Sequence, residues 1–370
     1  MGKKIVKPDF FSSKDNLPKG ISLIDAFTRS LSELFFIDNP KYKKEMPESK
    51  KLLDNYLKKS KVKGVWIYFS WRKAAVYTLP ESLYFRLRTA RNREIITEKE
   101  QTQFRRGFVG IVGLSVGSVL LSSLVSNGGP KNFRLADFDE IEVTNLNRMK
   151  ATVLDIGRLK TDVAAANVWE LDPFANLDLW SQGVNKKNLE KFILGKPKLH
   201  LFVDAMDSLD LKILARFICK KHKIPVIMIT ENGDNSILDV ERYDKDKNLL
   251  PFQGRIGNAR LSDFKNLNYK EWLRLASKIV GAEFLSPEMQ SSILKLGRSI
   301  ASVPQLSTSV SVGGAGAAKI IRRILCGKPM PTGRYLINLD EKIIPGYRSN
   351  KQKLSRSKLT KKFILSLTGR

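Results

Sequence analysis

The sequence has few residues that bind soft metals or form disulfides. Its 370 residues include two cysteines and two histidines. Cys219 and Cys326 lie far apart, and no pair among these four residues has the spacing of a zinc site, so a structural zinc is not expected. The first residues are basic, and the apolar stretch of an export signal does not follow them. Together these absences predict a cytoplasmic protein.

Long apolar runs are also missing. No run reaches the about 18 residues that a transmembrane helix needs, so we expect no transmembrane segment. Apolar residues nevertheless make up 42% of the chain, which excludes a disordered or collagen-like protein. At about 150 residues per domain, the length suggests two or three domains.

Acidic residues are outnumbered by basic ones. The chain has 65 Lys and Arg but 37 Asp and Glu, a net charge of +28. Residues 1–100 contribute a net +10, residues 101–250 a net +2 and residues 251–370 a net +16. The basic flanks suit a polyanion such as tRNA or an acidic lipid surface, although a general role in solubility explains the charge equally well.

In the nearly neutral middle of the chain, apolar strand-like runs alternate with segments of helical periodicity. The predicted strands are 107–113, 133–139, 199–207 and 225–230, and the predicted helices between them are 118–127, 158–171 and 209–222. This alternation predicts βαβ units, and therefore an α/β, Rossmann-like doubly wound fold with a mostly parallel sheet.

The flanks predict further modules around this sheet. The chain is divided into an N-terminal α+β module over 1–90, a central domain over 91–345 with an excursion over 231–305, and a basic tail over 346–370. Within the module, 64–79 predicts two strands around a polar break at 71–73. Residues 231–260 predict a long polar loop, residues 261–326 are expected to be mostly helical, and 332–345 predicts a returning strand. The tail has eight basic residues and no acid, and is expected to be solvated apart from a short helix at KKFILSL.

A glycine turn follows the first central strand. The segment GIVGLSVGS places Gly113 and Gly117 between a strand and a helix, where free N–H groups suit a phosphate. Ser115 stands where the dinucleotide pattern requires glycine, so that pattern is incomplete. Asp137 closes the next strand, near the offset of about 20 residues expected of a ribose-binding acid.

This turn fits three kinds of site. One is an NAD-binding Rossmann site and another is a different nucleotide site with Asp137 on the ribose. The third is a hydrolase with Ser115 as nucleophile, which needs a histidine late in the chain. Only His200, inside an apolar run, and His222, among lysines, are present, so the hydrolase is disfavoured.

The next segment carries a long ordered motif. DFDEIEVTNLNRMKATVLDIGRLK follows the second strand, and DAMDSLD closes the strand at 207. Over roughly 91–245 the chain resembles the ThiF/MoeB family, the bacterial relatives of ubiquitin-activating enzymes. The resemblance implies ATP-dependent adenylation of a carboxylate, with Mg²⁺ held at the site and pyrophosphate released. The residue types suit this chemistry by themselves, since phosphoryl transfer needs cations around developing negative charge.

The resemblance also assigns roles to individual residues, all of them polar and all expected around the nucleotide. They are Asp137 on the ribose, Asn145 and Arg148 on the triphosphate, Lys160 on the phosphates, Asp207 on Mg²⁺, Asp139 on the metal or on Arg148, and Arg93 on the triphosphate of a partner subunit. Gly113, Ser115 and Gly117 form the phosphate loop, which departs from the family's glycine-rich form. The role of Arg93 predicts a homodimer.

The family resemblance leaves the acyl acceptor open. Many members pass the acyl group to a cysteine in the loop after the third strand, and residues 231–260 contain none. Cys219 lies in an apolar helix and Cys326 at a helix end, so we expect no thioester step. The carboxylate could end a ubiquitin-like or small carrier protein.

Three alternatives remain. The run VTNLNR also resembles the tRNA threonylcarbamoyladenosine dehydratase branch, and basic flanks suit tRNA phosphates. An NAD enzyme has no use for Arg148, Lys160 and Asp207 together. A non-enzymatic nucleic-acid binder explains the net charge of +28 but not the acidic strand ends.

Overall fold

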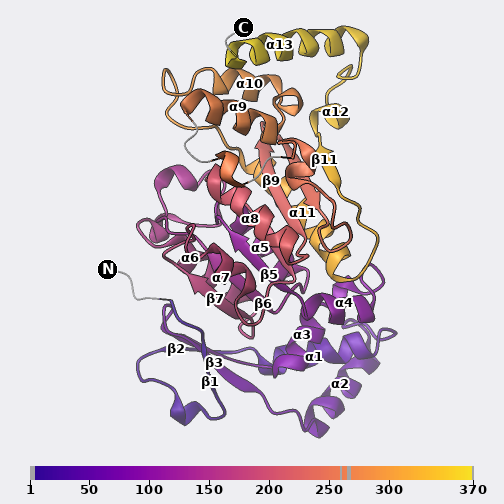
Figure 1. The fold of residues 1–370 in the computed structure, drawn as a ribbon. Helices are drawn as coiled ribbons and strands as arrows, with labels where there is room; N and C mark the ends of the chain where they lie inside the picture. The colour runs from indigo at the N-terminus through magenta and orange to yellow at the C-terminus, as the bar shows by residue number, and fades with distance from the viewer. Residues whose placement is uncertain (1–4, 259–260, 265–267, 369–370) are drawn as a thin grey trace.

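The computed structural model describes residues 5–258, 261–264 and 268–368 (Figure 1). A small sheet with its helices lies at one end of the molecule, a seven-stranded sheet lies in the middle, and the C-terminal helices lie at the other end. Among the described residues, none of the helices combines the length and the apolar character needed to span a membrane.

The N-terminal segment forms a four-stranded sheet in the order β1-β3-β4-β2. The two strands expected around the break at 71–73 are confirmed as an antiparallel pair, β3 and β4. Leu31, Leu34 and Leu79 form the small core between this sheet and its helices. The elements are β1 (Asp9–Phe11), β2 (Ser22–Asp25), β3 (Val65–Phe69), β4 (Ala74–Thr78), α1 (Phe27–Asp38), α2 (Pro47–Lys59), α3 (Glu81–Arg88) and α4 (Glu98–Arg105), with 3-10 turns η1 (Lys14–Asn16) and η2 (Ala90–Asn92).

The central sheet has the order β11-β10-β9-β8-β5-β6-β7, and the expected doubly wound, mostly parallel arrangement is confirmed. The strands from β5 to β9 are parallel, and β10 and β11 extend the sheet antiparallel. Their bounds are β5 (Phe108–Val112), β6 (Asn132–Ala136), β7 (Asn176–Trp180), β8 (Leu201–Asp204), β9 (Val226–Asn232), β10 (Asn235–Glu241) and β11 (Gly333–Ile337).

Helices cover both faces of this sheet. One face packs against α5 (Val116–Ser126), α6 (Lys160–Leu171) and α11 (Ser307–Leu325), and the other against α7 (Leu189–Leu194) and α8 (Leu209–Lys221). Strand β8 is apolar up to Asp204 at its end because it is covered on both faces. Leu201 and Val203 enter the first core, and Phe202 between them enters the second. Alternate residues of a strand face opposite sides, so a strand covered on both faces needs no polar positions.

The expectation of a long polar loop over 231–260 is wrong. Strand β10 pairs with β9 over seven residues, and every residue of β10 is buried. Asn232, Gly233, Asp234 and Asn235 lie at the turn, where Gly233 has φ +67°. Gly233 and Asp234 are the two loop residues, and glycine at the first of them is a hairpin signal, because a type II′ turn requires positive φ there. The polar turn residues concealed the apolar strand that follows them.

The C-terminal residues are also more ordered than expected of a solvated tail. The helix α13 (Asn350–Thr368) spans 19 residues, and Phe363 on it is 2% exposed against Leu285 and Met289. Gln290 donates to the Thr360 hydroxyl over 2.8 Å. The other elements are α9 (Tyr269–Val280), α10 (Pro287–Ile293), α12 (Asp340–Ile343), η3 (Val143–Asn145), η4 (Val153–Asp155), η5 (Pro251–Gly254), η6 (Leu261–Phe264) and η7 (Ala282–Phe284).

A buried carboxylate joins the N-terminal segment to the central sheet. Asp172, directly after α6, accepts from Arg88 Nη2 over 3.1 Å and pairs with Arg105. Arg88 Nη1 also donates to the carbonyl oxygen of Val125, at the end of α5, over 2.6 Å. Tyr84 donates its hydroxyl to the carbonyl oxygen of Leu171 over 3.0 Å. The ends of two central helices are therefore held by side chains from 84–105.

Candidate nucleotide site

The carboxyl ends of the central strands border a cavity of about 1240 Å³. One end is lined by the start of α5 and by polar residues from 139–160, and the middle by residues that follow β8 and end β9. The third part of its wall comes from 276–305. Ligands of open α/β sheets bind at this edge, so the cavity lies where the sequence predicts a nucleotide.

The glycine turn contributes one of its three predicted residues to the cavity wall. Gly113 has φ +90°, and a Cβ there would overlap the carbonyl oxygen of Ala205. Gly117 lies in the first turn of α5, where a Cβ would stand 2.8 Å from Ile111 Cγ2. Both glycines therefore serve close packing of the segments after β5 and β8 and of the helix on the sheet. Ser115 lines the cavity.

Asp137 ties the glycine turn to the end of β6. Its Oδ2 accepts from the Leu114 N–H over 2.6 Å, and its Oδ1 accepts from the Asp139 N–H over 2.9 Å. Burial raises the pKa of this carboxyl, and the two N–H donors oppose that effect. Asp137 is buried and lies outside the described cavity wall, so its predicted contact with a ribose stays a prediction.

Arg148 is held at the cavity wall by three hydrogen bonds. Its Nε donates to Ser115 Oγ over 3.0 Å, and Nη1 donates over 2.9 Å to both the Thr144 carbonyl oxygen and Asn147 Oδ1. Burial lowers the pKa of the guanidinium, whereas Glu231 and Asp207 act in the opposite direction. Within the described structure, Nη2 donates to no protein group, so its N–H groups are open to a ligand.

The loop that carries Arg148 is fixed by side chains. Asn145 is buried in the cavity wall, and its Oδ1 accepts from the Glu142 N–H over 3.0 Å in a capping box around η3. Asn147 donates to the carbonyl oxygen of Gln305 over 2.8 Å, across the cavity rim. Asn145 thus shapes the loop from inside, and Asn147 connects it to the excursion.

Lys160 begins α6 and forms an ion pair with Asp139. Its Nζ lies 2.6 Å from Asp139 Oδ2, and its side chain is 9% exposed while that of Asp139 is 50% exposed. The backbone N–H of Lys160 also donates to the Asp139 carbonyl oxygen over 2.9 Å. The expected alternative that Asp139 holds Arg148 is wrong, because its carboxylate holds Lys160.

Two carboxylates meet near Arg148. Asp207 follows β8 and is exposed in the cavity, and Glu231 lies near the end of β9. Burial and then the charge of Asp207 raise the pKa of Glu231, while Lys212 and Arg148 lower it. Gln305 donates to Glu231 Oε1 over 3.2 Å. The sequence analysis missed Glu231, although an acid at the end of a predicted strand was available as a signal.

A buried ionic network lies beneath these residues. Asp204 is fully buried at the end of β8 and accepts from Lys212 Nζ over 2.9 Å and from Arg216 Nη1 over 2.5 Å. Arg216 also contacts Glu241 over 2.8 Å. Burial opposes ionisation of Asp204, but Lys212 and Arg216 prevail and lower its pKa. Lys212, which lines the cavity, was not predicted either.

Arg93 is not brought to the cavity. It is exposed at the end of η2 and lies outside the set of described residues that line the cavity. Its predicted contact with a partner subunit stays a prediction. In the described ranges, no group of three or more His, Cys, Asp or Glu side chains is arranged to hold a metal ion without other ligands.

The two thiols lie away from the described cavity wall. Cys219 is buried in α8, and Cys326 is half-buried, with its Sγ 3.4 Å from the carbonyl oxygen of Glu100. Burial raises the pKa of both thiols.

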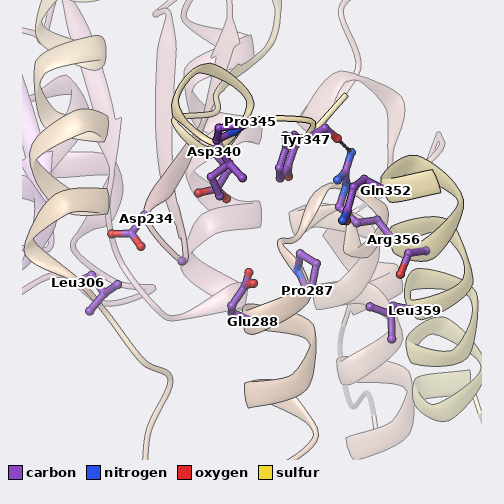
Figure 2. Close-up of a pocket in the computed structure, with 13 residues that line it drawn as sticks. Asp234, Pro287, Glu288, Leu306, Asp340, Pro345, Tyr347, Gln352, Arg356 and Leu359 are labelled. Atoms are coloured by element: carbon purple, nitrogen blue, oxygen red, sulfur yellow. Dashed lines mark hydrogen bonds between the residues drawn. The ribbon is translucent and has the colours of Figure 1, made fainter. Parts of the chain in front are cut away.

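A second cavity of about 480 Å³ lies beside the C-terminal helix (Figure 2). Asp234, Glu288 and Asp340 line one part of it. On the other side, Arg356 stacks over the ring of Tyr347 at 3.8 Å and donates to its carbonyl oxygen over 2.8 Å. The strand-end residues of the nucleotide site are not part of its wall.

Comparisons with known proteins agree on the central region. Residues 88–238 match the model of the ThiF family. The chain is 34% identical over 274 residues to the uncharacterized protein MT1398 of Mycobacterium tuberculosis, covering 74% of this chain and 38% of the relative. It is 30% identical over 138 residues to tRNA threonylcarbamoyladenosine dehydratase 2 of Saccharomyces cerevisiae, covering 37% of this chain and 31% of the relative. The chain thus spans about a third of the length of these two relatives.

One solved structure supports the fold. The crystal structure of selenomethionine PaaA matches with a TM-score of 0.50 at 18% identity, covering 70% of this chain and 77% of PaaA. At this identity the likeness concerns the fold alone.

Proposed function

Since this chain belongs to the ThiF family through residues 88–238, we propose that it binds ATP and adenylates a carboxylate. The observation that carries the proposal is the group of charges around one cavity. Arg148 in the loop after β6, Lys160 at the start of α6 and Asp207 after β8 line the same space at the carboxyl edge of the sheet. An NAD site requires no such set of charges.

The reaction requires little covalent participation by the protein. A carboxylate oxygen of the substrate attacks the α-phosphorus of ATP, the bond from this phosphorus to the bridging oxygen breaks, and pyrophosphate leaves. Negative charge grows on the phosphate oxygens, so fixed cations accelerate the step. The N–H groups of Arg148 Nη2 are available to phosphate oxygens, and Lys160 supplies a second positive charge.

The donor set fits Mg²⁺. The ion is usually held by one or two carboxylates together with substrate phosphates, and Asp207 and Glu231 supply two carboxylates near Arg148. When bound, the ion would neutralise charge on the phosphates. Asp207 is exposed in the cavity, and a bound cation would oppose the burial that raises the pKa of Glu231.

We propose that the acyl-adenylate is captured directly by an amine, a hydroxyl or another nucleophile, without a thioester. The absence of both thiols from the described cavity wall supports this order of events. A ubiquitin-like or small carrier protein is one source of the carboxylate.

Exchange of labelled pyrophosphate into ATP, with Mg²⁺ and a panel of carboxylates, tests the proposal. We expect exchange to depend on the added carboxylate and to fall at least about a hundredfold in Asp207→Asn. Asp210→Asn is the matched control, because Asp210 lies three residues on, pairs with Lys186 and is outside the described cavity wall. Full exchange in Asp207→Asn would contradict the assignment.

A second candidate is activation of threonylcarbamoyladenosine on tRNA. The names of the yeast relative and of the Haemophilus influenzae relative, 28% identical over 141 residues, favour it, as do the exposed basic residues of α13. An atom of the same modified nucleoside, on the side next to the nucleobase, would attack the activated carboxyl, which releases AMP and closes a ring. Mass spectrometry of modified tRNA tests it, since the product is lighter by one water.

A further inference from the structure

The two ends of the nucleotide cavity differ in chemistry. The part of the wall that comes from 276–305 has ten described residues, and none of them is charged. They include Ala276, Ile279, Val280, Leu285, Met289 and Ile293. We call the part of the wall that these six side chains form the apolar arm.

The sheet side of the apolar arm is apolar as well. Leu209 at the start of α8 and Met228 on β9 line it, and each is at most 5% exposed. Both pack with Ile279 in one cluster, while Leu285 and Met289 pack with Phe363 in another. The arm thus lies between two packed clusters.

The excursion that carries the arm is fixed to the sheet by buried polar groups. Asn232, at the end of β9, donates to the Phe284 carbonyl oxygen over 3.0 Å and accepts from the Ser286 N–H over 2.6 Å. Arg334 on β11 donates to the Ile279 carbonyl oxygen over 2.8 Å, while Asp239 accepts from the same guanidinium over 2.8 and 2.7 Å. These bonds hold the apolar wall in place before any ligand arrives.

The cavity is large enough for two ligands. Its volume of about 1240 Å³ exceeds the range of roughly 300–1,000 Å³ that holds one drug-sized molecule. The charged residues and the apolar arm line the same cavity, so a nucleotide bound at Arg148 and Lys160 would leave room beside the arm.

We propose that the apolar arm binds the body of the acid that is activated, so that the substrate is a carboxylate attached to a bulky apolar group. This inference rests on the proposed adenylation. The described wall of the arm offers no charge to pair with a charged or polar body. A terminal glycine would leave the arm unfilled, whereas each methylene in an apolar pocket improves selection about tenfold or more.

The test combines exchange with direct binding. The acids are hexanoate, 4-phenylbutanoate, acetate and a peptide ending in Gly-Gly, and the variants of the full chain are Ala276→Trp and Lys278→Trp. The first indole would fill the arm, because Ala276 lines it, whereas Lys278 is exposed on the same helix and lies outside the described wall. Calorimetry measures acid binding with and without ATP, and ATP binding alone checks that each variant is folded.

We expect the two apolar acids to support exchange at least tenfold better than acetate or the Gly-Gly peptide. Ala276→Trp should lose this advantage and the calorimetric signal of 4-phenylbutanoate, and Lys278→Trp should keep both. Exchange with the Gly-Gly peptide but not with apolar acids overturns the inference and leaves adenylation standing. Binding of apolar acids that Ala276→Trp abolishes, with no exchange for any acid, supports the arm and overturns adenylation. Equal binding in both variants overturns the arm.

Discussion

Arg148 donates its Nε to the hydroxyl of Ser115 over 3.0 Å, and this bond joins the loop after β6 to the first turn of α5. The guanidinium therefore has a fixed orientation before a ligand binds. Ser115 stands where the dinucleotide pattern has glycine, and it serves a structural role there, because glycine has no side chain to accept the hydrogen bond from Arg148.

Replacement of Arg148 tests whether the guanidinium fork is required. We expect Arg148→Lys to reduce pyrophosphate exchange by about 100- to 1,000-fold, because lysine lacks the planar fork whose Nε and Nη1 are held by protein groups while Nη2 is left for phosphate oxygens. Ser115→Ala should have a smaller effect, since Thr144 and Asn147 still hold Nη1. The ratio kcat/KM for ATP measures both. Exchange by Arg148→Lys at the unaltered rate would show that the fork is dispensable.

Glu231 gives a prediction about the metal requirement. We expect Glu231→Gln to raise the Mg²⁺ concentration for half-maximal exchange at least about tenfold, because it removes one of two carboxylates beside the phosphates. Chelation of Mg²⁺ should abolish exchange in the unaltered chain. Glu288→Gln is the control, because Glu288 lines the other cavity. An unchanged Mg²⁺ requirement would remove Glu231 from the metal site.

The thiols give a prediction about pH. Burial raises the pKa of Cys326, so its thiolate fraction at neutral pH is below that of a free cysteine. Iodoacetamide should label Cys326 slowly near pH 7, and the rate should rise as pH approaches and passes the ordinary thiol value. Cys326→Ala should keep full exchange and full product formation. A thioester adduct that this variant loses would contradict direct capture.

The buried network beneath the site makes a prediction about stability. Arg216→Met leaves Asp204 and Glu241 buried without their shared cation, and we expect it to lower the free energy of unfolding by about 3–5 kcal/mol. Arg29→Met removes an exposed pair with Glu33 and should change it by less than about 0.5 kcal/mol. Denaturation in urea compares the two. Equal midpoints would show that Arg216 contributes no more than a surface pair.

Arg93 makes a prediction about subunits. If it acts on a partner's nucleotide, Arg93→Ala and Asp207→Asn should each lose exchange, and a mixture of the two chains should regain part of it. Only a mixed dimer has one site with both residues intact. The measurement compares pyrophosphate exchange in two samples: in one the two variant chains are mixed before dilution, and in the other they are mixed after dilution. Failure of the mixture to regain exchange would place Arg93 outside a shared site.

The parallel sheet could be predicted from the sequence because its most buried strands consist mostly of apolar residues. The run around Leu201, Phe202 and Val203 is such a strand, buried on both faces. Strand β10 escaped prediction because it follows a polar turn at Asn232 to Asn235, and the polar character of this turn led to the interpretation of all of 231–260 as a loop. Strand β7 was missed because its residues are half-exposed at the sheet edge and form no continuous apolar run.

The candidate site residues could be selected from the sequence because they belong to an ordered motif that resembles the ThiF/MoeB family. Arg148, Lys160 and Asp207 are such residues, and the structure brings them to one cavity. Gly117 was assigned to the phosphate loop, but its contact with Ile111 depends on how the helix lies on the sheet. The apolar arm could not be predicted, because its walls come from segments that only the folded chain brings together.

The ion pairs of Asp172 bear on how this protein can be divided. Similarity to the family begins at residue 88, whereas Glu81 and Tyr84, which contact Arg105 and the end of α6, lie before it. A fragment cut at that border would keep Arg88 and Arg105 but lose the helix that supports them. The family match therefore begins inside a helix whose side chains pack and pair with the central domain, and shortened versions for expression should start well before residue 88.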